Sequence, residues 1–599
     1  MKKIFLKNKK GFTLIESLLA ISVFSLLVMT FVGAMIYGQE SERTAGERAR
    51  ATFLAEEGLE AVRNIRDANF ATIVNSPTTY GLAVSGNVWT FSGTQDVMNG
   101  YFTRKITISD LSPVDFNAKR VISEVTWQQT PQRTGTITLS ENISRWQSLH
   151  RGGMLVYGNG GTTVDTISYK ILNPDTGVWS AQANAADVDG TSTNRALRSV
   201  KIFSSRIRNE RIIISKHIDT GPNPDAQYIY AQVYNGATGT WGNVQLLSNW
   251  TNNSYTDVQN FDGTYLDNGD FMVTYSNNST TPQFRIWNGS NWSGQMAMRV
   301  SGGIPNYIVA KNRPNTNEVM VAVFDQGSDT NTQYYDGSGY ATTDWTAHTE
   351  HSALAPLATK RFVDFDWSQN SATRGALVYS DSSTDRALNI KIWAANGSGG
   401  GAWSATANTG NQGGTSTRLG AMAVQGRKGS DEFIACNNNT DNDILCYESN
   451  FTPTWSNPSN QTLETGTDTG IQRTFDIAFE LLDGNEAIAV YSNASTTPRL
   501  KKYDPSGNSW DSSSTALSGL TSALETVRII PNSDMNDAMI LLGDTGTPQR
   551  VYSTVWDGTN NTTYSTPVSL TLINQSNNGS ADENYWFDFA WDEFDFTNT

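Results

Sequence analysis

The chain of 599 residues is long enough for two or three domains of ordinary size. Only 17% of its residues are charged, 11% are aromatic, and glycine occurs 50 times. This composition favours an all-β extracellular protein over a cytosolic helical enzyme. The formal net charge of −15 argues against nucleic acid as a partner, because an acidic protein surface repels a phosphate backbone.

The N-terminus combines a short basic segment with a long apolar one. Residues 1–11 end in Lys9, Lys10 and Gly11, and the stretch 12–37 that follows is almost wholly apolar, with Glu16 as its single charge. A helix of this length rises roughly 39 Å and can therefore span a bilayer. The preceding lysines predict that the N-terminus faces the cytoplasm and that the bulk of the chain lies outside. No small-residue cleavage site follows the apolar run, so an ordinary secretory signal fits poorly.

Residues 10–17 read KGFTLIES and resemble the processing motif of type IV prepilins, which pilins and type II secretion pseudopilins share. The resemblance implies that prepilin peptidase cleaves after Gly11 and that the new amino group of Phe12 is methylated. It also implies that Glu16 pairs with the N-terminal amine of another subunit during assembly. A carboxylate in hydrocarbon costs a few kcal/mol unless it is paired, which is consistent with such a role.

The helical pattern continues beyond the apolar segment. Apolar residues recur three to five positions apart among Glu and Arg, so we expect one helix over residues 12–69, membrane-bound at first and amphipathic later. Residues 70–148 then alternate with the period of strands, most clearly at 104–108, 121–127 and 134–139. Three such strands could cover the amphipathic helix as the small head of a minor pilin does. Residues 149–152 form the expected linker.

From residue 153 to residue 599 the sequence repeats with a period typical of propellers. Eight apolar strands recur, and many are followed by an Asn-Gly or Asp-Pro-Ser-Gly turn that closes on an aromatic residue. The expected fold is therefore an α+β pilin module, with a long helix and a small antiparallel sheet, followed by an all-β domain that forms an eight-bladed β-propeller.

A finer pattern predicts that the repeats close into a ring. Alternate repeats begin with Asp-x-x-aromatic, but the first repeat lacks this strand and a copy of it occurs at the extreme C-terminus instead. A closed ring explains this displacement, because the last strand would complete the first blade. The four aspartates of the pattern are Asp262, Asp364, Asp476 and Asp588.

Two sets of residues could carry chemistry in this domain. If the four aspartates line the axis, they could hold calcium, although each could instead bond backbone within its own blade. Cys436 and Cys446 fall in one predicted hairpin, where they either form a disulfide, as an exported chain would allow, or stay unpaired. No cofactor is required by any motif. The four histidines have no metal or triad spacing, so an enzyme is not expected.

These features together predict a minor type IV pilin that displays an adhesion or recognition propeller. The propeller is too bulky to be present on every subunit of a fibre, so it is expected at the tip of the fibre. Expected partners are other pilin subunits, prepilin peptidase, the inner-membrane assembly machinery, the membrane itself, and a glycan or protein ligand on a host or other surface. The protein would reside in the inner membrane before assembly and on an extracellular filament afterwards. The alternatives are a pseudopilin of a type II secretion or DNA-uptake machine, and a surface-displayed glycan hydrolase.

Overall fold

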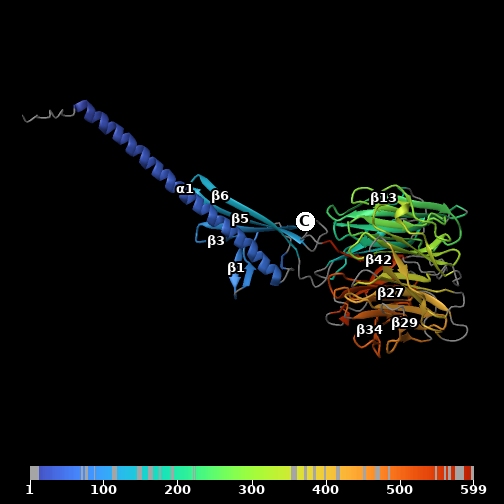
Figure 1. The fold of residues 1–599 in the computed structure, drawn as a ribbon. Coiled ribbons are helices and arrows are strands. Elements are labelled where there is room, and N and C mark those ends of the chain that lie inside the picture. The colour runs from blue at the N-terminus through green and yellow to red at the C-terminus, as the bar shows by residue number, and fades with distance from the viewer. Residues whose placement is uncertain are drawn as a thin grey trace, which may run out of the picture. The chain divides into compact units, whose positions relative to one another are not determined.

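The computed structural model describes residues 13–594 with internal gaps (Figure 1). The ranges outside the description are 69–71, 74–78, 87, 111–117, 145–151, 159–165, 174–176, 191–194, 220, 223, 353–360, 370–373, 382–385, 397–399, 413–417, 450–453, 466–472, 483, 485, 547–548, 559–561, 564–567 and 574–585. The chain divides into two compact units. Unit 1 comprises Met1–Leu111 and Ala118–Gln147, and unit 2 comprises Ser112–Asn117 and Ser148–Thr599.

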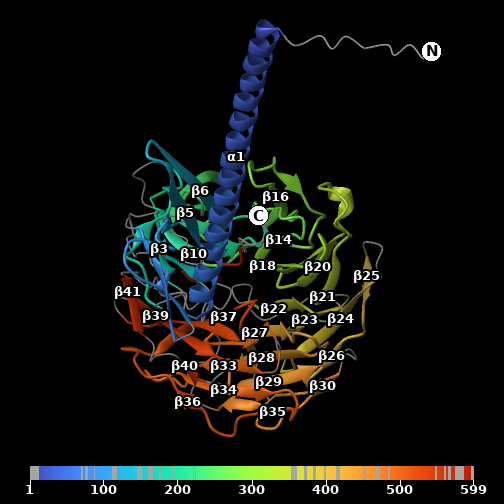
Figure 2. The same ribbon diagram turned by 90° about the vertical axis from the view of Figure 1, so that its left-hand side faces the viewer.

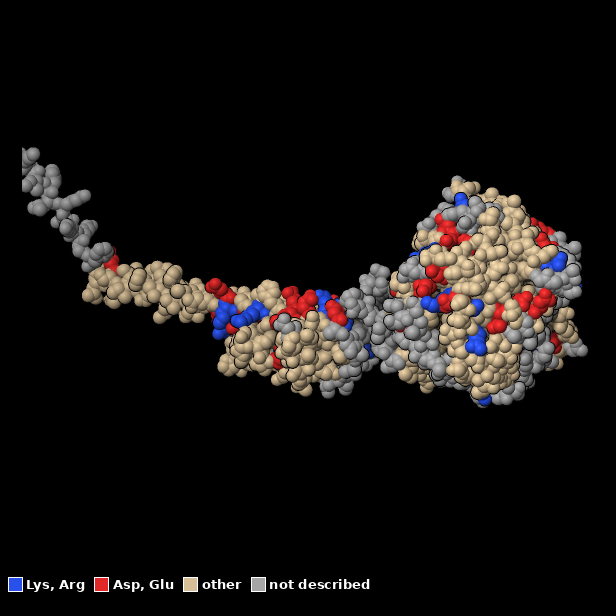
Figure 3. Space-filling view, turned by 90° about the horizontal axis from the view of Figure 1, so that it is seen from below, with Lys and Arg blue, Asp and Glu red and all other residues tan. Residues whose placement is uncertain are grey.

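Unit 1 begins with the helix α1 (Leu14–Ala68), which ends one residue before the predicted limit. Its first part has a mean hydropathy of 2.4 over its most apolar 18 residues, none of which is buried within the unit, so it is long and apolar enough to cross a membrane. Figure 3 shows this part almost free of charged side chains, whereas charges of both signs cover the second part. The second part buries Ala51, Ala55 and Val62 against a sheet.

The rest of unit 1 is a small β structure. An antiparallel sheet has the order β3-β4-β5-β6, and β1 and β2 form a separate hairpin. The strands are β1 (Leu82–Ser85), β2 (Val88–Phe91), β3 (Asp96–Met98), β4 (Phe102–Asp110), β5 (Ala118–Thr130) and β6 (Arg133–Ser144). The three strands predicted from alternation lie within β4, β5 and β6. Strands β1 to β3 were not predicted, because three or four residues are too few to show a period.

Two side-chain features explain how closely the helix lies against this sheet. Gly58 faces the sheet, and a Cβ atom at this position would collide with Oγ of Ser123. Arg104 of β4 is only 2% exposed and donates to Oδ2 of Asp96 (2.9 Å), to Oε2 of Glu57 (3.1 Å) and to the carbonyl of Leu54 (2.9 Å). One buried guanidinium thus joins β3, β4 and α1, and its charge is paired, as a buried charge must be.

Unit 2 consists of antiparallel sheets of four or five strands, and the described residues form eight of them. Sheet 1 contains β42 (Phe587–Trp591), β7 (Gly153–Gly158), β8 (Ile167–Leu172) and β9 (Ala183–Asn184). Sheet 2 contains β10 (Arg195–Ser204), β11 (Glu210–Asp219), β12 (Ala226–Asn235) and β13 (Thr240–Thr251). Sheet 3 contains β14 (Phe261–Tyr265), β15 (Phe271–Tyr275), β16 (Gln283–Trp287) and β17 (Met296–Ala297). Sheet 4 contains β18 (Pro305–Asn312), β19 (Val319–Asp325), β20 (Thr330–Tyr335) and β21 (Thr349–Ser352), with the short helix η2 (Thr342–Asp344) before β21.

The remaining sheets follow in chain order. Sheet 5 contains β22 (Val363–Trp367), β23 (Arg374–Tyr379), β24 (Asn389–Ala395), β25 (Gly401–Trp403) and β26 (Ala407–Asn408). Sheet 6 contains β27 (Leu419–Gly426), β28 (Phe433–Asn439), β29 (Ile444–Ser449), β30 (Trp455–Ser456) and β31 (Thr462–Glu464). Sheet 7 contains β32 (Phe475–Phe479), β33 (Ala487–Tyr491), β34 (Arg499–Asp504), β35 (Ser509–Trp510) and β36 (Thr515–Ala516). Sheet 8 contains β37 (Leu524–Pro531), β38 (Asp537–Asp544), β39 (Gln549–Asp557), β40 (Thr562–Thr563) and β41 (Val568–Ile573).

The sheets of unit 2 stand in chain order around a ring (Figure 2). The first strand of each sheet contacts the first strand of the next, and β37 of sheet 8 contacts β42 of sheet 1. Apolar clusters fill the junctions; one of them joins Tyr234 of sheet 2 to Met154 of sheet 1. The ring closes between distant parts of the chain, because β42 pairs with β7 from Phe587 opposite Tyr157 to Trp591 opposite Gly153.

Tryptophans that close the predicted turns contact aromatic residues of the sheets. Trp292 contacts Trp287 with ring centroids 5.5 Å apart, and Trp510 lies 5.3 Å from Tyr503. Trp510 is 2% exposed, whereas Trp292 is partly buried. These contacts attach the outer strands to the rest of each sheet, because an aromatic side chain buries a large area when it packs.

Candidate functional site

The first strands of the sheets enclose a cavity of about 590 Å³ along the axis of unit 2. Its walls come from residues 201–207, 262–269, 309–315, 528–531 and 588–593, together with a few residues between them. The turns that join the first and second strands of several sheets belong to this lining, so the cavity reaches the face of unit 2 on which those turns lie. Ion-pairing side chains line its interior, and they form the candidate site.

The four aspartates of the repeated pattern all line this cavity, and they share one hydrogen-bond arrangement. Each accepts, through Oδ2, a backbone N–H from the first strand of the next sheet. The bonds run from Ile202 to Asp588 (3.1 Å), from Ala310 to Asp262 (3.0 Å), from Val424 to Asp364 (3.1 Å) and from Ile529 to Asp476 (2.9 Å). Each aspartate therefore joins an odd-numbered sheet to the even-numbered sheet that follows it.

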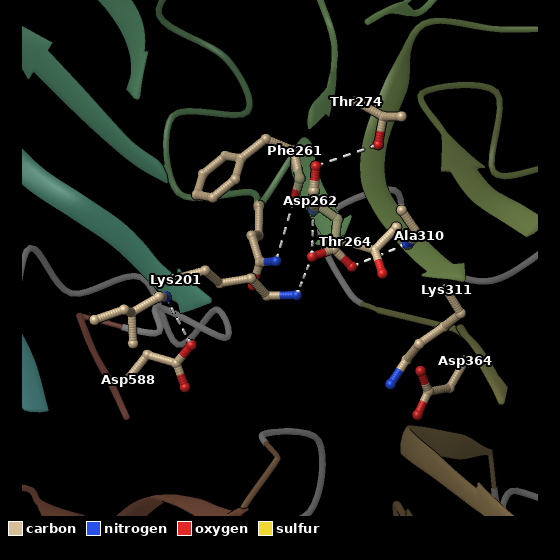
Figure 4. A network of polar contacts seen from close by, with 12 residues as sticks. Lys201, Phe261, Asp262, Thr264, Thr274, Ala310, Lys311, Asp364 and Asp588 are labelled. Atoms are coloured by element: carbon tan, nitrogen blue, oxygen red, sulfur yellow. Dashed lines mark hydrogen bonds and ion pairs between the residues drawn. The ribbon is translucent and has the colours of Figure 1, made fainter. Parts of the chain in front are cut away.

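The other carboxylate oxygen of each aspartate accepts from a cation. The pairs are Lys201 with Asp262 (2.8 Å), Arg361 with Asp364 (2.7 Å), Arg473 with Asp476 (2.6 Å) and Arg528 with Asp588 (2.9 Å). Figure 4 shows the part of this arrangement around Asp262 and Asp588. Two of the cations, Lys201 and Arg528, come from the preceding sheet, so their ion pairs cross the junctions between sheets 2 and 3 and between sheets 8 and 1.

The four ion pairs around the cavity, called the belt below, interact electrostatically with one another. Burial lowers the pKa of Lys201 to about 8, against the attraction of Asp262 and with further repulsion from Arg361 and Arg528. Burial by itself would raise the pKa of Asp364, but Arg361 and other cations hold that pKa below its ordinary value. The cationic side chains from different sheets are thus close enough to interact.

This geometry differs from the calcium site that the sequence left open. Bonding to backbone within one blade occurs at Asp262, whose Oδ1 also accepts the N–H of Gly263 at 2.9 Å, but each aspartate in addition bonds the backbone of the next blade. Asp262, Asp364, Asp476 and Asp588 use their oxygens on cations and on the next sheet's backbone, and no group of three or more potential ligands among the described residues could hold a metal ion. The physical reason is that lysine and arginine supply the compensating charge. Sequence reasoning missed these cations, although Arg361 and Arg473 each stand three residues before their aspartates.

The two cysteines form a disulfide between neighbouring strands. Cys436 of β28 lies directly opposite Cys446 of β29, with Cα atoms 4.1 Å apart, and both side chains are fully buried. They belong to the apolar cluster that joins sheet 6 to sheet 7. A buried disulfide suits a chain that is exported to an oxidising compartment.

At the N-terminus, Glu16 lies in the first turn of α1. Its Oε2 accepts from the backbone N–H of Thr13 (3.0 Å) and from Oγ1 of the same residue (2.9 Å), and its side chain is exposed in the isolated chain. The processing residues Gly11 and Phe12 lie outside the described residues. Most of the expected linker, residues 149–151, also lies outside them. Gly152 accepts a backbone hydrogen bond from Asp592 (2.8 Å).

Structural comparison returns weak similarities to β-propellers. The β-propeller domain of the Trilobed protease from Pyrococcus furiosus matches at 8% identity and a TM-score of 0.34, covering 63% of this chain and all of that domain. The SapL1 lectin in complex with alpha methyl fucoside matches at 14% identity and a TM-score of 0.32, covering 53% of this chain and 97% of the lectin. The ring described above rests on its own strand pairing and not on these similarities.

Sequence comparison identifies the N-terminus. Residues 6–32 match the family model described as the prokaryotic N-terminal methylation motif, whereas no curated protein matches the chain. The matched residues run from the basic segment into the apolar part of α1, the same helix whose second part packs on a small sheet. The chain therefore has the N-terminal methylation motif of type IV pilin-like proteins, carried on a long apolar helix and followed by a β-propeller-like domain.

Proposed function

We propose that this protein is a minor type IV pilin that displays an eight-bladed β-propeller for adhesion or recognition at the tip of a pilus. Unit 1 is the pilin module in this proposal, with β3–β6 as its small head, and the eight sheets of unit 2 are the blades. The observation that carries the proposal is the methylation motif on a helix whose first part is exposed and apolar while its second part is packed.

Assembly follows from the N-terminal residues. Prepilin peptidase cleaves after Gly11 and methylates the amine of Phe12, and the inner-membrane machinery then extracts the helix into a filament. Glu16 is exposed in the chain by itself, so its carboxylate is available to the N-terminal amine of a neighbouring pilin subunit. Pairing removes the cost of an isolated carboxylate in the apolar core of a fibre. The protein moves in this way from the inner membrane to the cell surface.

The size of unit 2 favours a minor subunit. Helical packing brings every major subunit close to its neighbours, and a domain that spans residues 148–599 on each of them would obstruct that packing. One such subunit at the end of a fibre meets no such obstacle. A tip position also brings the propeller first to a host cell or another surface.

Binding suits this propeller better than catalysis does. The four repeated aspartates of the cavity are ion-paired and hydrogen-bonded to neighbouring sheets, whereas a glycosidase needs an acid and a second carboxylate that both face the substrate. A recognition surface is available on the face opposite the one at which Gly152 enters unit 2. Two turns on that face, 276–282 and 492–498, repeat the sequence Ser-Asn-x-Ser-Thr-Thr-Pro and present polar groups that suit a glycan or protein ligand.

Immunogold labelling with an antibody against unit 2 tests the proposal on whole cells and on sheared filaments. We expect gold at filament tips, and we expect none on filaments from cells that carry Glu16→Ala, which should leave the protein in the membrane. Label confined to the cell envelope, with filaments bare in both strains, would refute the pilin proposal. That outcome would favour a pseudopilin of a secretion or DNA-uptake machine, since pseudopilins share the motif. Release of sugars from glycans by the purified chain would instead favour the hydrolase.

A further inference from the structure

We propose that the axial cavity of unit 2 is a binding site for a small organic carboxylate, held by the inward-facing N–H donors of Lys201, Lys311 and Arg361. This site is separate from the proposed adhesion surface, which lies on the opposite face of unit 2 and would bind larger ligands. The proposal rests on the direction of the donors, on the way in which the aspartates are already used, and on the size and position of the opening.

The donors come from different sheets and reach into one space. Lys201 of β10 and Lys311 of β18 both line the cavity together with Arg361, and Figure 4 shows the Lys201 side chain reaching Asp262. Lys201 donates one of its three N–H groups to Asp262. Arg361 donates through Nε to the carbonyl of Val363 and through Nη2 to Asp364, and its Nη1 has no acceptor among the described residues.

Lys311 is the most available of these cations. Its side chain is 40% exposed, and its nearest carboxylate oxygen, on Asp366, is 3.9 Å away, beyond hydrogen-bonding distance. Oδ2 of Asp366 accepts the backbone N–H of Gly426 at 2.8 Å, and Oδ1 is the oxygen that faces Lys311. A ligand oxygen between Lys311 and Arg361 would therefore complete hydrogen bonds that the protein leaves open.

The acceptors of the belt are turned away from such a ligand. Oδ2 of each paired aspartate is bound to the backbone of the next sheet, and Oδ1 is bound to a cation. The four ion pairs thus present N–H donors to a ligand, because both oxygens of each aspartate are already used. Carboxylates are the acceptors that arginine and lysine bind best, and arginine can bind them with two parallel bonds.

The charge and the size of the cavity narrow the class of ligand. The cavity lining carries six basic and seven acidic side chains, so it has no large net charge to attract a polyanion. The basic residues are Lys201, Arg206, Lys311, Arg361, Arg473 and Arg528, and the acidic residues are Asp262, Asp267, Asp364, Asp366, Asp476, Asp588 and Glu593. A volume of about 590 Å³ falls within the usual range for small-molecule sites. A single carboxylate on a small molecule fits these limits.

The surroundings of the opening also favour a small ligand with an apolar part. The face that the cavity reaches is the one where the chain enters at Gly152 and where β42 ends. Ile207, which lines the cavity near this face, is 52% exposed, and Leu481 and Pro531 line the same region. Apolar side chains at the opening and donors within would orient a carboxylate inward.

Isothermal titration calorimetry on the full chain in detergent micelles tests the proposal with two matched pairs of probes. Glucuronate is compared with glucose, and N-acetylalanine with N-acetylalaninamide. We expect at least one carboxylate to bind and its uncharged partner to bind at least tenfold more weakly. The charge-neutral double substitution R361Q/D364N should weaken the carboxylate at least tenfold, because it removes the guanidinium while the introduced amide oxygen can still accept from the backbone of Val424. The single substitution K311Q should weaken it as well.

The control is K502Q/E486Q, which neutralises an ion pair of sheet 7 away from the cavity and should leave binding unchanged. A melting curve for every variant shows whether the fold is retained. The proposal is overturned if neither carboxylate binds, if the uncharged partners bind equally, or if K311Q binds as tightly as the unaltered protein. None of these outcomes depends on where the protein is displayed, so they leave the pilus proposal to the labelling experiment.

Discussion

Replacing Asp588 by alanine removes a carboxylate that joins three consecutive sheets at the point where the ring closes. Asp588 is 4% exposed, its Oδ2 accepts from the backbone N–H of Ile202 at 3.1 Å, and its Oδ1 pairs with Arg528 at 2.9 Å. Breaking a buried ion pair costs about 3–5 kcal/mol in typical cases. The Arg528 side chain is 19% exposed and can be partly hydrated, so we expect a loss of about 3 kcal/mol.

The assay is urea unfolding of the full chain in detergent micelles, followed by tryptophan fluorescence. The double substitution D588N/R528Q removes both charges, but the introduced amide oxygen can still accept from the backbone of Ile202. We expect the free energy of unfolding of this double variant to lie within about 1 kcal/mol of that of the unaltered protein, because neutralising both partners leaves no uncompensated charge. Ser513→Ala, at an exposed position, serves as the control and should change stability by no more than about 0.5 kcal/mol. If D588A lowers the free energy of unfolding no more than this control does, the belt of ion pairs does not stabilise the ring.

Three further changes test other parts of the chain. Gly58→Val should destabilise unit 1 by at least about 2 kcal/mol, because the added side chain collides with the sheet; amide exchange of β5 should increase, whereas exchange in unit 2 should not. Replacing Cys436 and Cys446 together by alanine should lower the melting temperature, since the disulfide closes a loop with a sequence separation of 10 and stabilises by up to about 3 kcal/mol; unchanged melting would contradict this. Burial lowers the pKa values of His217 and His351 to about 3. The unfolded chain therefore binds more protons than the folded chain between about pH 3 and pH 6.5, and stability should fall as the pH falls through this window; His351→Gln should reduce the slope in urea titrations at several pH values.

The sequence was most informative where a physical requirement acts on neighbouring residues. An apolar segment after a basic one predicts a membrane helix directly, and the glutamate within it stands out because of its cost. The displaced Asp-x-x-aromatic strand at Asp588 was informative in another way, since a strand missing from the first repeat had to be supplied from elsewhere. The strand β42 pairs with β7 and so supplies the strand that the first repeat lacks.

The candidate site was harder to predict, because its partners are far apart in the chain. Asp262 pairs with Lys201 and Asp588 pairs with Arg528, each about sixty residues earlier, and no local period marks these cations. Only Arg361 and Arg473 repeat a fixed distance from their aspartates. Without knowledge of the cations, calcium binding and backbone bonding within each blade were the alternatives for the four carboxylates. The short strands β1 to β3 were missed because strands of that length show no alternation.

The pairing of β42 with β7 also determines when the protein can finish folding. Residues 587–591 are synthesised after the other described strands of the ring, yet they form the first strand of sheet 1, whose other strands begin at Gly153. Until they arrive, β7 has an open edge, and an unpaired edge strand is prone to pair with another chain. Contacts of such long sequence separation form slowly. A nascent chain held in the membrane by its helix would complete its ring only after residues 587–591 are exported, so a truncation before residue 587 should yield an aggregation-prone precursor and not a shorter working subunit.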